Sequence, residues 1–249
     1  MIRGIYTSGL GMIKETKRLD VISNNLANAS TNAFKSSGVT SGNFAKALSD
    51  VRVGRSKIDI ENYTPDAVNT YTNYTQGSLK NTANKTDLAI TGDNHAFFEV
   101  ENDEGEKLYT RDGSFSVNKD GYLVTDEGYK VLGEKGYINL NNNEIGISAA
   151  GQITALKDNS VIDTLSIKSF ENPETLSKLG DNFVKPGEES IMTKFTGEVQ
   201  QGYLEMSNVN TVNEMVNMIS VTRAYEANQK VLQAQDEMLG KAVSDVGKV

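Results

Sequence analysis

The sequence has 249 residues, which is enough to bury a hydrophobic core as one or two domains. Its net charge of -8, from 25 basic and 33 acidic residues, argues against a nucleic-acid-binding protein, because such a protein needs a basic face. The absence of cysteine excludes disulfides, thiolate metal sites and a cysteine nucleophile.

The sequence also lacks the marks of membrane insertion. No run of about 18 apolar residues occurs anywhere, so we expect no membrane-spanning helix. The N-terminal segment has no uninterrupted apolar stretch followed by a small-residue cleavage site, so we expect no secretory signal peptide. If the protein leaves the cytoplasm, another export route must carry it.

An N-terminal helix is predicted over residues 1–35. Ile5, Met12, Leu19 and Leu26 fall seven residues apart, which is the spacing of a coiled-coil-like seam. The seam positions between them are mostly small or polar, and they are Ser8, Gly9, Glu15, Thr16, Ile22 and Ser23. Glycines at 9 and 11 each weaken a helix by about 1 kcal/mol relative to alanine, but small residues let a neighbouring backbone come close.

The end of this predicted helix is rich in asparagine. The stretch DVISNNLANASTNAFK, residues 20–35, contains Asn24, Asn25, Asn28 and Asn32. Asparagine is a poor helix former, because its amide competes for nearby backbone groups. Two explanations are open at this point: a buried seam lined by amides, or a fraying helix end.

The middle of the chain has a different pattern. Residues 36–86 are rich in Ser, Thr, Asn and Gly, and we expect an extended connector there. Residues 87–204 are predicted to form a β-rich domain, because segments such as AFFEV, KLYT, SFSV and YLVT alternate apolar and polar residues. The separators NDEGE, NKDG, TDEG and GEKG are typical of hairpin turns, so the strands should be mostly antiparallel.

A second long helix is predicted at the C-terminal end, within residues 205–249. The sequence TVNE is a capping box in which Thr211 caps the helix and Glu214 bonds back to it. An apolar stripe follows, made of Val212, Met215, Ile219, Thr222, Leu232 and Leu239. Around Glu226 and Gln229 the stripe turns polar, which is unusual for a lone amphipathic helix.

These patterns predict an α+β fold: long N- and C-terminal helices that pack as a coiled-coil-like pair, and a central, mostly antiparallel β domain. Such a helix pair commonly just caps a globular domain. The length of these helices and their lack of local partners equally favour assembly with other chains.

The residues suggest no catalytic site and no metal or cofactor site. His95 is the single histidine, so the sequence does not provide the residues for a histidine-based triad or a histidine-rich metal site. We expect His95 to lie in a loop. NKDG and TDEG do not fit the twelve-residue calcium loop and are better explained as turns. The GLG of residues 9–11 has no preceding strand and no third glycine, so it is not a dinucleotide fingerprint.

Five longer stretches carry a resemblance to a known family. They are LDVISNNLANASTNAFK, QGSLKNTANKTDLAITG at 76–92, YTRDGSFSVNKDGYLVTDEGYKVLG at 109–133, FENPETLSKLGDNFV at 170–184 and GYLEMSNVNTVNEMVNMISVTRAYEANQKVLQAQDEML at 202–239. In sequence and in order they resemble the axial rod proteins of the bacterial flagellar basal body, a family that includes the hook protein. The first residues are more similar to the distal rod member, whereas the length and the middle also suit the proximal one.

Two positions depart from the family pattern. The family usually reads Thr-x-Gly-Phe-Lys after the asparagine-rich stretch, whereas Ala33 stands in the glycine place here. The loop before FFEV usually carries glycine, and this chain has Asn94, His95 and Ala96. Both departures concern local turn geometry.

The resemblance implies a structural subunit that polymerises into the helical rod, the driveshaft that carries motor torque to the hook for motility. It implies no enzymatic activity, a place in the basal body within the cell envelope, and export in an unfolded state by the flagellar type III apparatus. The partners would be further copies and neighbouring rod and hook-family proteins. The four asparagines would then bond between tightly packed helices and fix their register.

Two other functions remain alternatives. A secreted adhesin or binding module would have a β domain that works without the termini and carries a discrete pocket. A cell-wall hydrolase would need paired carboxylates in a cleft, whereas the acidic residues here fall mostly in predicted turns.

Overall fold

The computed structural model describes residues 2–41, 68–141, 144–158, 160–180 and 182–246. The chain divides into two compact units. The helix unit comprises Met1–Ala27, Ser37–Thr72 and Asn210–Val249, and the β unit comprises Asn28–Ser36 and Asn73–Val209. Neither helix of the described residues is long and apolar enough to cross a membrane.

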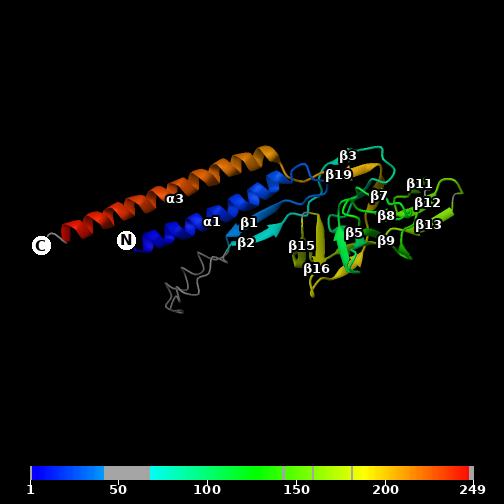
Figure 1. Ribbon diagram of the computed structural model, residues 1–249, viewed down its shortest axis with the longest axis horizontal. Helices are drawn as coiled ribbons and strands as arrows, with labels where there is room; N and C mark the ends of the chain where they lie inside the picture. The colour runs from blue at the N-terminus through cyan, green and yellow to red at the C-terminus, as the bar shows by residue number, and fades with distance from the viewer. Residues whose placement is uncertain (1, 42–67, 142–143, 159, 181, 247–249) are drawn as a thin grey trace. The chain divides into compact units, whose positions relative to one another are not determined.

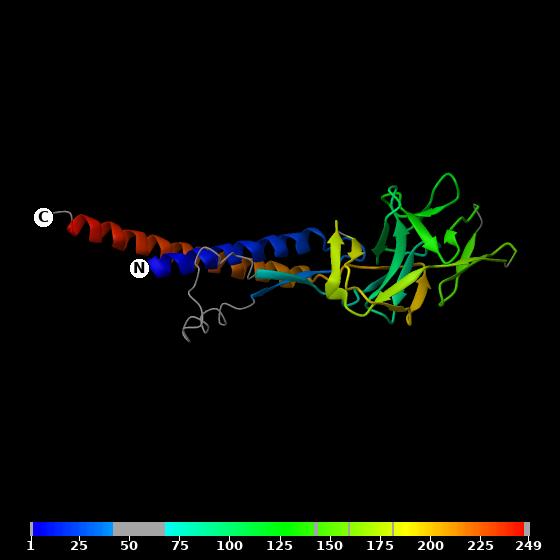
Figure 2. The same cartoon turned by 90° about the horizontal axis from the view of Figure 1, so that it is seen from below.

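The helix unit is built on two long helices, α1 (Ile2–Ala27) and α3 (Thr211–Val246), which pack side by side (Figures 1 and 2). Two antiparallel strands, β1 (Ser37–Ser41) and β2 (Val68–Thr72), belong to the same unit. The segment expected as an extended connector, residues 36–86, is therefore partly paired strand, and its residues 42–67 lie outside the described residues.

The N-terminal helix is shorter than the range 1–35 expected from the sequence, because α1 ends at Ala27. The asparagine-rich segment turns away from the helix there. The backbone N–H of Thr31 donates to the Asn28 carbonyl at 3.2 Å, and the Thr31 hydroxyl donates to the Asn28 side-chain oxygen at 3.0 Å. The last two asparagines of the stretch thus follow the helix, as their poor helix propensity favours.

The C-terminal helix begins where expected, but its cap differs from the prediction. Asn210, not Thr211, caps α3, since its side-chain oxygen accepts from the N–H of Asn213 at 3.1 Å. The Asn210 carbonyl accepts the first helical hydrogen bond, from the N–H of Glu214 at 3.0 Å. Asparagine is among the strongest N-cap residues, so it outcompetes the threonine that follows it.

The β unit contains the remaining strands. The first of them are β3 (Leu79–Asn81), β4 (Leu88–Thr91), β5 (Ala96–Glu101), β6 (Lys107–Thr110), β7 (Ser116–Val117), β8 (Leu123–Val124), β9 (Lys130–Gly133), β10 (Gly136–Tyr137) and β11 (Ile145–Ile147). The later ones are β12 (Gln152–Ala155), β13 (Ser160–Thr164), β14 (Ile167–Phe170), β15 (Leu176–Leu179), β16 (Phe183–Pro186), β17 (Met192–Lys194), β18 (Glu198–Gln201) and β19 (Tyr203–Glu205). A short 3-10 helix, η3 (Pro173–Thr175), precedes β15.

Every pair among these described strands is antiparallel, which confirms the predicted mostly antiparallel region. The main sheet has the order β15-β16-β6-β5-β9-β8-β7, with β10 paired to β9 and β14 joining β5 to β17. Strands β11, β12 and β13 form a small sheet. The last two strands of the unit return to its beginning, because β18 pairs with β4 and β19 pairs with β3.

The acidic separators are hairpin turns, as predicted. In NKDG, Gly121 has φ of 83°, and the side-chain oxygen of Asn118 accepts from the N–H groups of Asp120 and Tyr122. In TDEG, Gly128 has φ of 92° and its N–H donates to the carbonyl of Thr125. A left-handed glycine at these positions closes each turn without steric cost.

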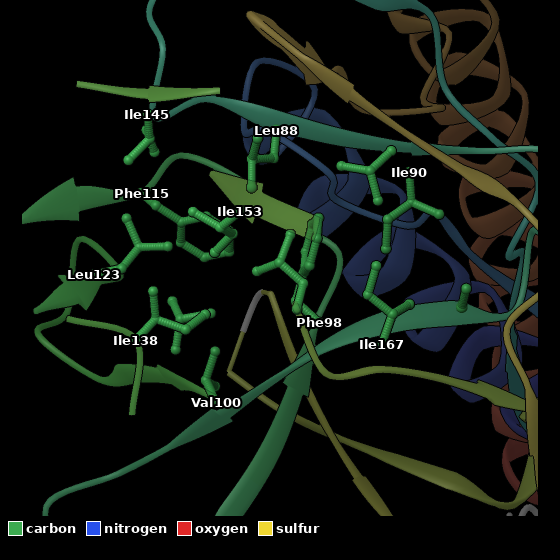
Figure 3. Close-up of a cluster of buried hydrophobic side chains, with 14 of the residues drawn as sticks. Leu88, Ile90, Phe98, Val100, Phe115, Leu123, Ile138, Ile145, Ile153 and Ile167 are labelled. Atoms are coloured by element: carbon green, nitrogen blue, oxygen red, sulfur yellow. The ribbon is translucent and has the colours of Figure 1, made fainter. Parts of the chain in front are cut away.

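One hydrophobic core fills the β unit (Figure 3). Its residues come from strands distant in sequence, and the fully buried ones include Leu88, Ile90, Phe98, Val100, Leu108 and Ile153. Phe98 also packs edge-to-face against Phe115, with ring centroids 5.2 Å apart. A second, smaller cluster on another part of the sheet contains Tyr74, Phe97, Tyr109, Phe170, Leu176 and Val184.

Truncation of the central aromatic tests this core. Phe98→Ala should lower the free energy of unfolding of the β unit by about 3–5 kcal/mol, because it removes a ring that is fully buried. Val161→Ala is the control, since Val161 is 49% exposed and should cost less than about 0.5 kcal/mol. Chemical denaturation followed by tyrosine fluorescence measures both, and equal losses would contradict the assigned core.

Candidate assembly surface

The two helices meet in one antiparallel register. Gly4 lies against the side chain of Gln235, Gly11 lies against that of Asn228, and Asn25 donates to Glu214 at 3.3 Å. Each step of seven or fourteen residues forward along α1 therefore corresponds to the same step backward along α3. A β-carbon at position 4 would sit 2.2 Å from the side-chain amide of Gln235, so a larger residue there would displace that side chain.

Asn25 is the most buried polar residue of this contact, with only 1% of its surface exposed. Its side-chain NH₂ donates to the Ser37 carbonyl at 2.8 Å as well as to Glu214, and its side-chain oxygen accepts from the Ser37 N–H at 2.9 Å. The amide thus joins α1 to β1 and to α3 inside one chain. This contact shows that an asparagine of the stretch does lie in a buried amide-lined seam.

The least exposed residues of α1 are mostly polar. Burial recurs along α1 in steps of seven and then three residues, and the residues exposed by less than 10% are Ser8, Glu15, Ile22 and Asn25. On α3 the buried and half-buried positions recur in steps of three or four, and they include Glu214, Met218, Val221, Tyr225, Asn228, Leu232, Gln235 and Leu239. Ordinary helix pairs bury a continuous apolar stripe, whereas this pair interrupts its apolar residues with glycines, amides and a carboxylate.

The outer face of α3 has the opposite character. Val212, Met215, Val216 and Ile219 are 67%, 52%, 57% and 55% exposed, so the first turns of the helix present a patch of large apolar side chains. We call these four residues the apolar patch of α3. Further exposed apolar residues along the same helix are Val231, Met238 and Val243. Contiguous apolar surface of this kind usually marks a site of protein–protein interaction.

The sequence-predicted seam residues fall on different faces. Val212, Met215 and Ile219 lie in the apolar patch, and Thr222 is exposed and donates its hydroxyl to the Met218 carbonyl. Leu232 and Leu239 are half-buried, on the steps that face α1. The stripe drawn on α3 from the sequence thus joined residues of two faces.

On α1 the predicted stripe is displaced by one position. Ile5, Met12, Leu19 and Leu26 are each half-buried, and three of them directly follow the contact residues Gly4, Gly11 and Asn25. Ile22 is buried at 7% exposure. The apolar stripe therefore lies beside the glycines and the asparagine that contact α3.

The other asparagines have separate roles. Asn24 is exposed on α1, and Asn28 and Asn32 are half-buried beyond the helix end, in the β unit. The hydrogen bond to Glu214 places Asn25 at the contact of α1 with α3. The sequence analysis did not identify Gly4, Asn228 and Gln235 as contact residues or Val216 as part of the patch. The one available signal was the seven-residue spacing between Gly4 and Gly11.

Ala33 resolves one departure from the family pattern. Its φ is 55°, in the left-handed region, and its N–H donates to the Glu205 carbonyl at 2.7 Å. The residue is buried, so the conformation is fixed by its surroundings. This position requires a left-handed backbone, which explains why glycine suits it and why alanine is strained there.

Three family models match the chain. They are described as flagella basal body rod protein at residues 5–35, flagellar hook protein FlgE/F/G D1 domain at residues 89–155, and flagellar basal body rod FlgEFG protein C-terminal at residues 200–245. The first and last cover most of α1 and α3, and the second covers the first half of the β unit.

Full-length relatives agree with these matches. The flagellar basal-body rod protein FlgG of Buchnera aphidicola from Acyrthosiphon pisum is 34% identical over 264 residues, covering 97% of this chain and 98% of the relative. FlgG of Borreliella burgdorferi is 34% identical over 272 residues, covering 97% and 98%. The rod protein FlgF of Rhizobium meliloti is 30% identical over 250 residues, covering 99% of both chains.

Glycine at position 11 should be required for the helix contact, and the nearby Gly9 provides a matched control. Leucine at either position gains about 1 kcal/mol of helix propensity. A β-carbon on residue 9 would have no atom within 4 Å, whereas one on residue 11 would lie 3.0 Å from Asn228. Gly9→Leu should therefore stabilise α1, and Gly11→Leu should push α3 away and speed amide hydrogen exchange in both helices. Identical exchange in the two variants would contradict the register described above.

Restoring glycine at position 33 should stabilise the protein. A left-handed backbone costs a non-glycine residue about 1–2 kcal/mol. Glycine avoids this cost, but a chain with glycine has more conformational freedom when unfolded, which offsets part of the gain in stability. Ala33→Gly should thus raise the free energy of unfolding by up to about 1 kcal/mol. Ala150→Gly is the control, because Ala150 is exposed and has no positive φ, and it should be neutral or destabilising. Thermal denaturation of the two variants checks the sign of each change.

Proposed function

The chain belongs to the flagellar basal-body rod proteins, and from that membership we propose that α1 and α3 are the surfaces through which it polymerises. As a member, it is a structural subunit of the flagellar basal body and not an enzyme. The adhesin and hydrolase alternatives find no support among its relatives.

The observation that carries the proposal is the exposed apolar patch of the helix unit. The contact between α1 and α3 includes glycines and the amides of Asn25, Asn228 and Gln235 among its apolar side chains, while the apolar patch of α3 is left open. Burying a Val, Met or Ile side chain contributes about 1.5–3 kcal/mol, so four such residues are a large unused source of stability. We propose that the helices of further copies and of neighbouring axial proteins cover the patch.

The lengths of the helices support the same conclusion. α1 has 26 residues and α3 has 36. Because Gly4 lies against Gln235, the last turns of α3 run past the start of α1 and cannot be covered by it. A contact that joins different surfaces of successive copies does not close on itself, so it generates an open helical assembly. Seams that repeat every seven residues would let the helices pack in a coiled-coil-like manner.

Within such a rod, each subunit would be held by several neighbours through its helices, as transmission of torque from motor to hook requires. Delivery by the flagellar type III export route is part of the same proposal. A chain without cysteine forms no disulfides and could pass through that route unfolded. The hook-family and rod-family matches support partners among the other axial proteins.

A substitution that places a charge in the apolar patch tests assembly separately from folding. Ile219→Asp should leave the free energy of unfolding of the single chain within about 0.5 kcal/mol, because Ile219 is 55% exposed. Inside a packed rod the same aspartate would be buried at a cost of several kcal/mol. We therefore expect a folded variant, absent from purified basal bodies, in cells that do not spread on soft agar.

Two controls accompany this variant. Gln229→Asp adds the same charge to an exposed polar position of α3, and Glu127→Lys alters an exposed turn of the β unit. Both should assemble and support motility. Basal bodies that contain Ile219→Asp at normal levels would refute the proposed assembly surface.

A further inference from the structure

One buried carboxylate connects distant parts of the β unit. Glu205, at the end of β19, is 1% exposed and lies between two cations that are also buried, Lys35 and Arg111. Its Oε1 accepts from the Lys35 ammonium and from the N–H of Gly77, the latter at 2.9 Å. Its Oε2 accepts from Arg111 Nε at 2.8 Å. We call these four residues the Glu205 cluster.

The cluster joins the two chain segments that lead to the helices. Residues 28–36 follow α1 directly, and residues 206–210 lead directly into α3. Lys35 belongs to the first segment, and the second begins beside Glu205. A further bond ties the same segments, since the N–H of Ala33 donates to the Glu205 carbonyl at 2.7 Å.

Asn208, three residues after Glu205, connects the incoming and outgoing segments a second time. Its side-chain oxygen accepts from the N–H of Ser36 at 2.8 Å, and its NH₂ donates to the carbonyls of Asn73 and Thr75 at 2.9 and 3.0 Å. The Lys35 ammonium also donates to the Thr75 carbonyl at 2.9 Å. The incoming segment, the outgoing segment and residues 73–77 are thus bonded to one another.

Arg111 extends the cluster into the sheet. Its guanidinium donates to the carbonyls of Asp93 and Ala96, both at 2.7 Å, and to the carbonyl of Ile90 at 3.3 Å. These carbonyls lie at the end of β4, in the loop that contains His95, and at the start of β5. Arg111 therefore fixes the loop that departs from the family pattern and couples Glu205 to β4 and β5.

Stability alone does not account for such a cluster. Apolar side chains of similar volume often stabilise a protein as well as a buried ion pair does, because burying charges carries a large desolvation cost. Hydrogen bonds between ionised groups are directional and about twice as strong as neutral ones, so they hold segments in one geometry. The burial of the Lys35 ammonium shows this cost, since it lowers the pKa of Lys35 although Glu205 acts to raise it.

We propose that the Glu205 cluster is the mechanical clamp of the subunit, through which load on α1 and α3 passes into the β unit. A load on the helix unit reaches the sheet through residues 28–36, 73–77 or 206–210, and these segments are bonded to one another at Glu205 and Asn208. In this role Glu205, Lys35 and Arg111 hold these segments against the sheet. The inference rests on the proposed function, because a rod subunit must transmit torque.

A single-chain measurement tests the clamp directly. The protein has no cysteine, so thiols for DNA handles can be placed at will. Handles at Ser30→Cys on the incoming segment and Asp103→Cys in an exposed turn load the clamp in an optical trap. Glu205→Gln keeps the shape of the side chain but removes its charge, so we expect the rupture force of the segment to fall about twofold. Glu198→Gln, an exposed carboxylate on β18, is the matched control and should leave the force unchanged.

Cells provide the second measurement. Where Glu205→Gln rods form, a motor turning a small bead should rotate normally, and one turning a large bead should lose rods or torque. An unchanged rupture force, or full torque under high load, would overturn the proposal. The trap measurement needs no assembly, so it stays decisive even if the variant fails to form rods. It is likewise independent of the Ile219→Asp result, which tests the assembly surface alone.

Discussion

The ion pairs of Glu205 are the constraint on which the geometry of the β unit depends. One carboxylate serves Lys35, Arg111 and the N–H of Gly77, so three segments from different parts of the chain must arrive together for it to be satisfied. A buried polar group left without a partner costs about 1–3 kcal/mol, and a charged one more. The cluster therefore penalises every arrangement in which a segment is misplaced. The left-handed Ala33 is held against the same residue, which shows that the surroundings are firm enough to sustain strain.

The two units are stabilised in opposite ways. The β unit has a continuous core in which Leu88, Ile90 and Phe98 are fully buried, so it has the components of an independently stable fold. The helix unit buries Asn25, Glu15 and Ser8 and exposes Val216 and Ile219. Since most helical stability in proteins comes from burial of an apolar face, the helix pair alone is weakly stabilised. Covering the apolar patch would therefore stabilise the helices, whereas the core of the β unit is complete within one chain.

The sequence was sufficient for the elements whose signals are local. Two long helices and the hairpins at Gly121 and Gly128 follow from periodicity and turn chemistry, which act over a few residues. The phase of the helix contact did not follow, because hydrophobic spacing pointed to Ile5 and Met12 whereas the contact uses the glycines one position earlier. The glycines and amides of the contact carry no hydrophobic signal. The Glu205 cluster was also invisible, since its charged members lie at positions 35, 111 and 205 and meet only in three dimensions.

The distribution of charge fits this division of roles. Of the 33 acidic residues, 22 lie in the β unit, together with 13 of the 25 basic residues. The β unit therefore carries the net negative charge of the chain, and the helix unit is close to neutral. Like charges oppose close association, so an acidic β unit helps to keep free copies apart. Close packing of many helices is possible only where that repulsion is small. An almost neutral pair of helices with an open apolar face is thus suited to dense packing, and the charged unit attached to it supplies solubility until packing occurs.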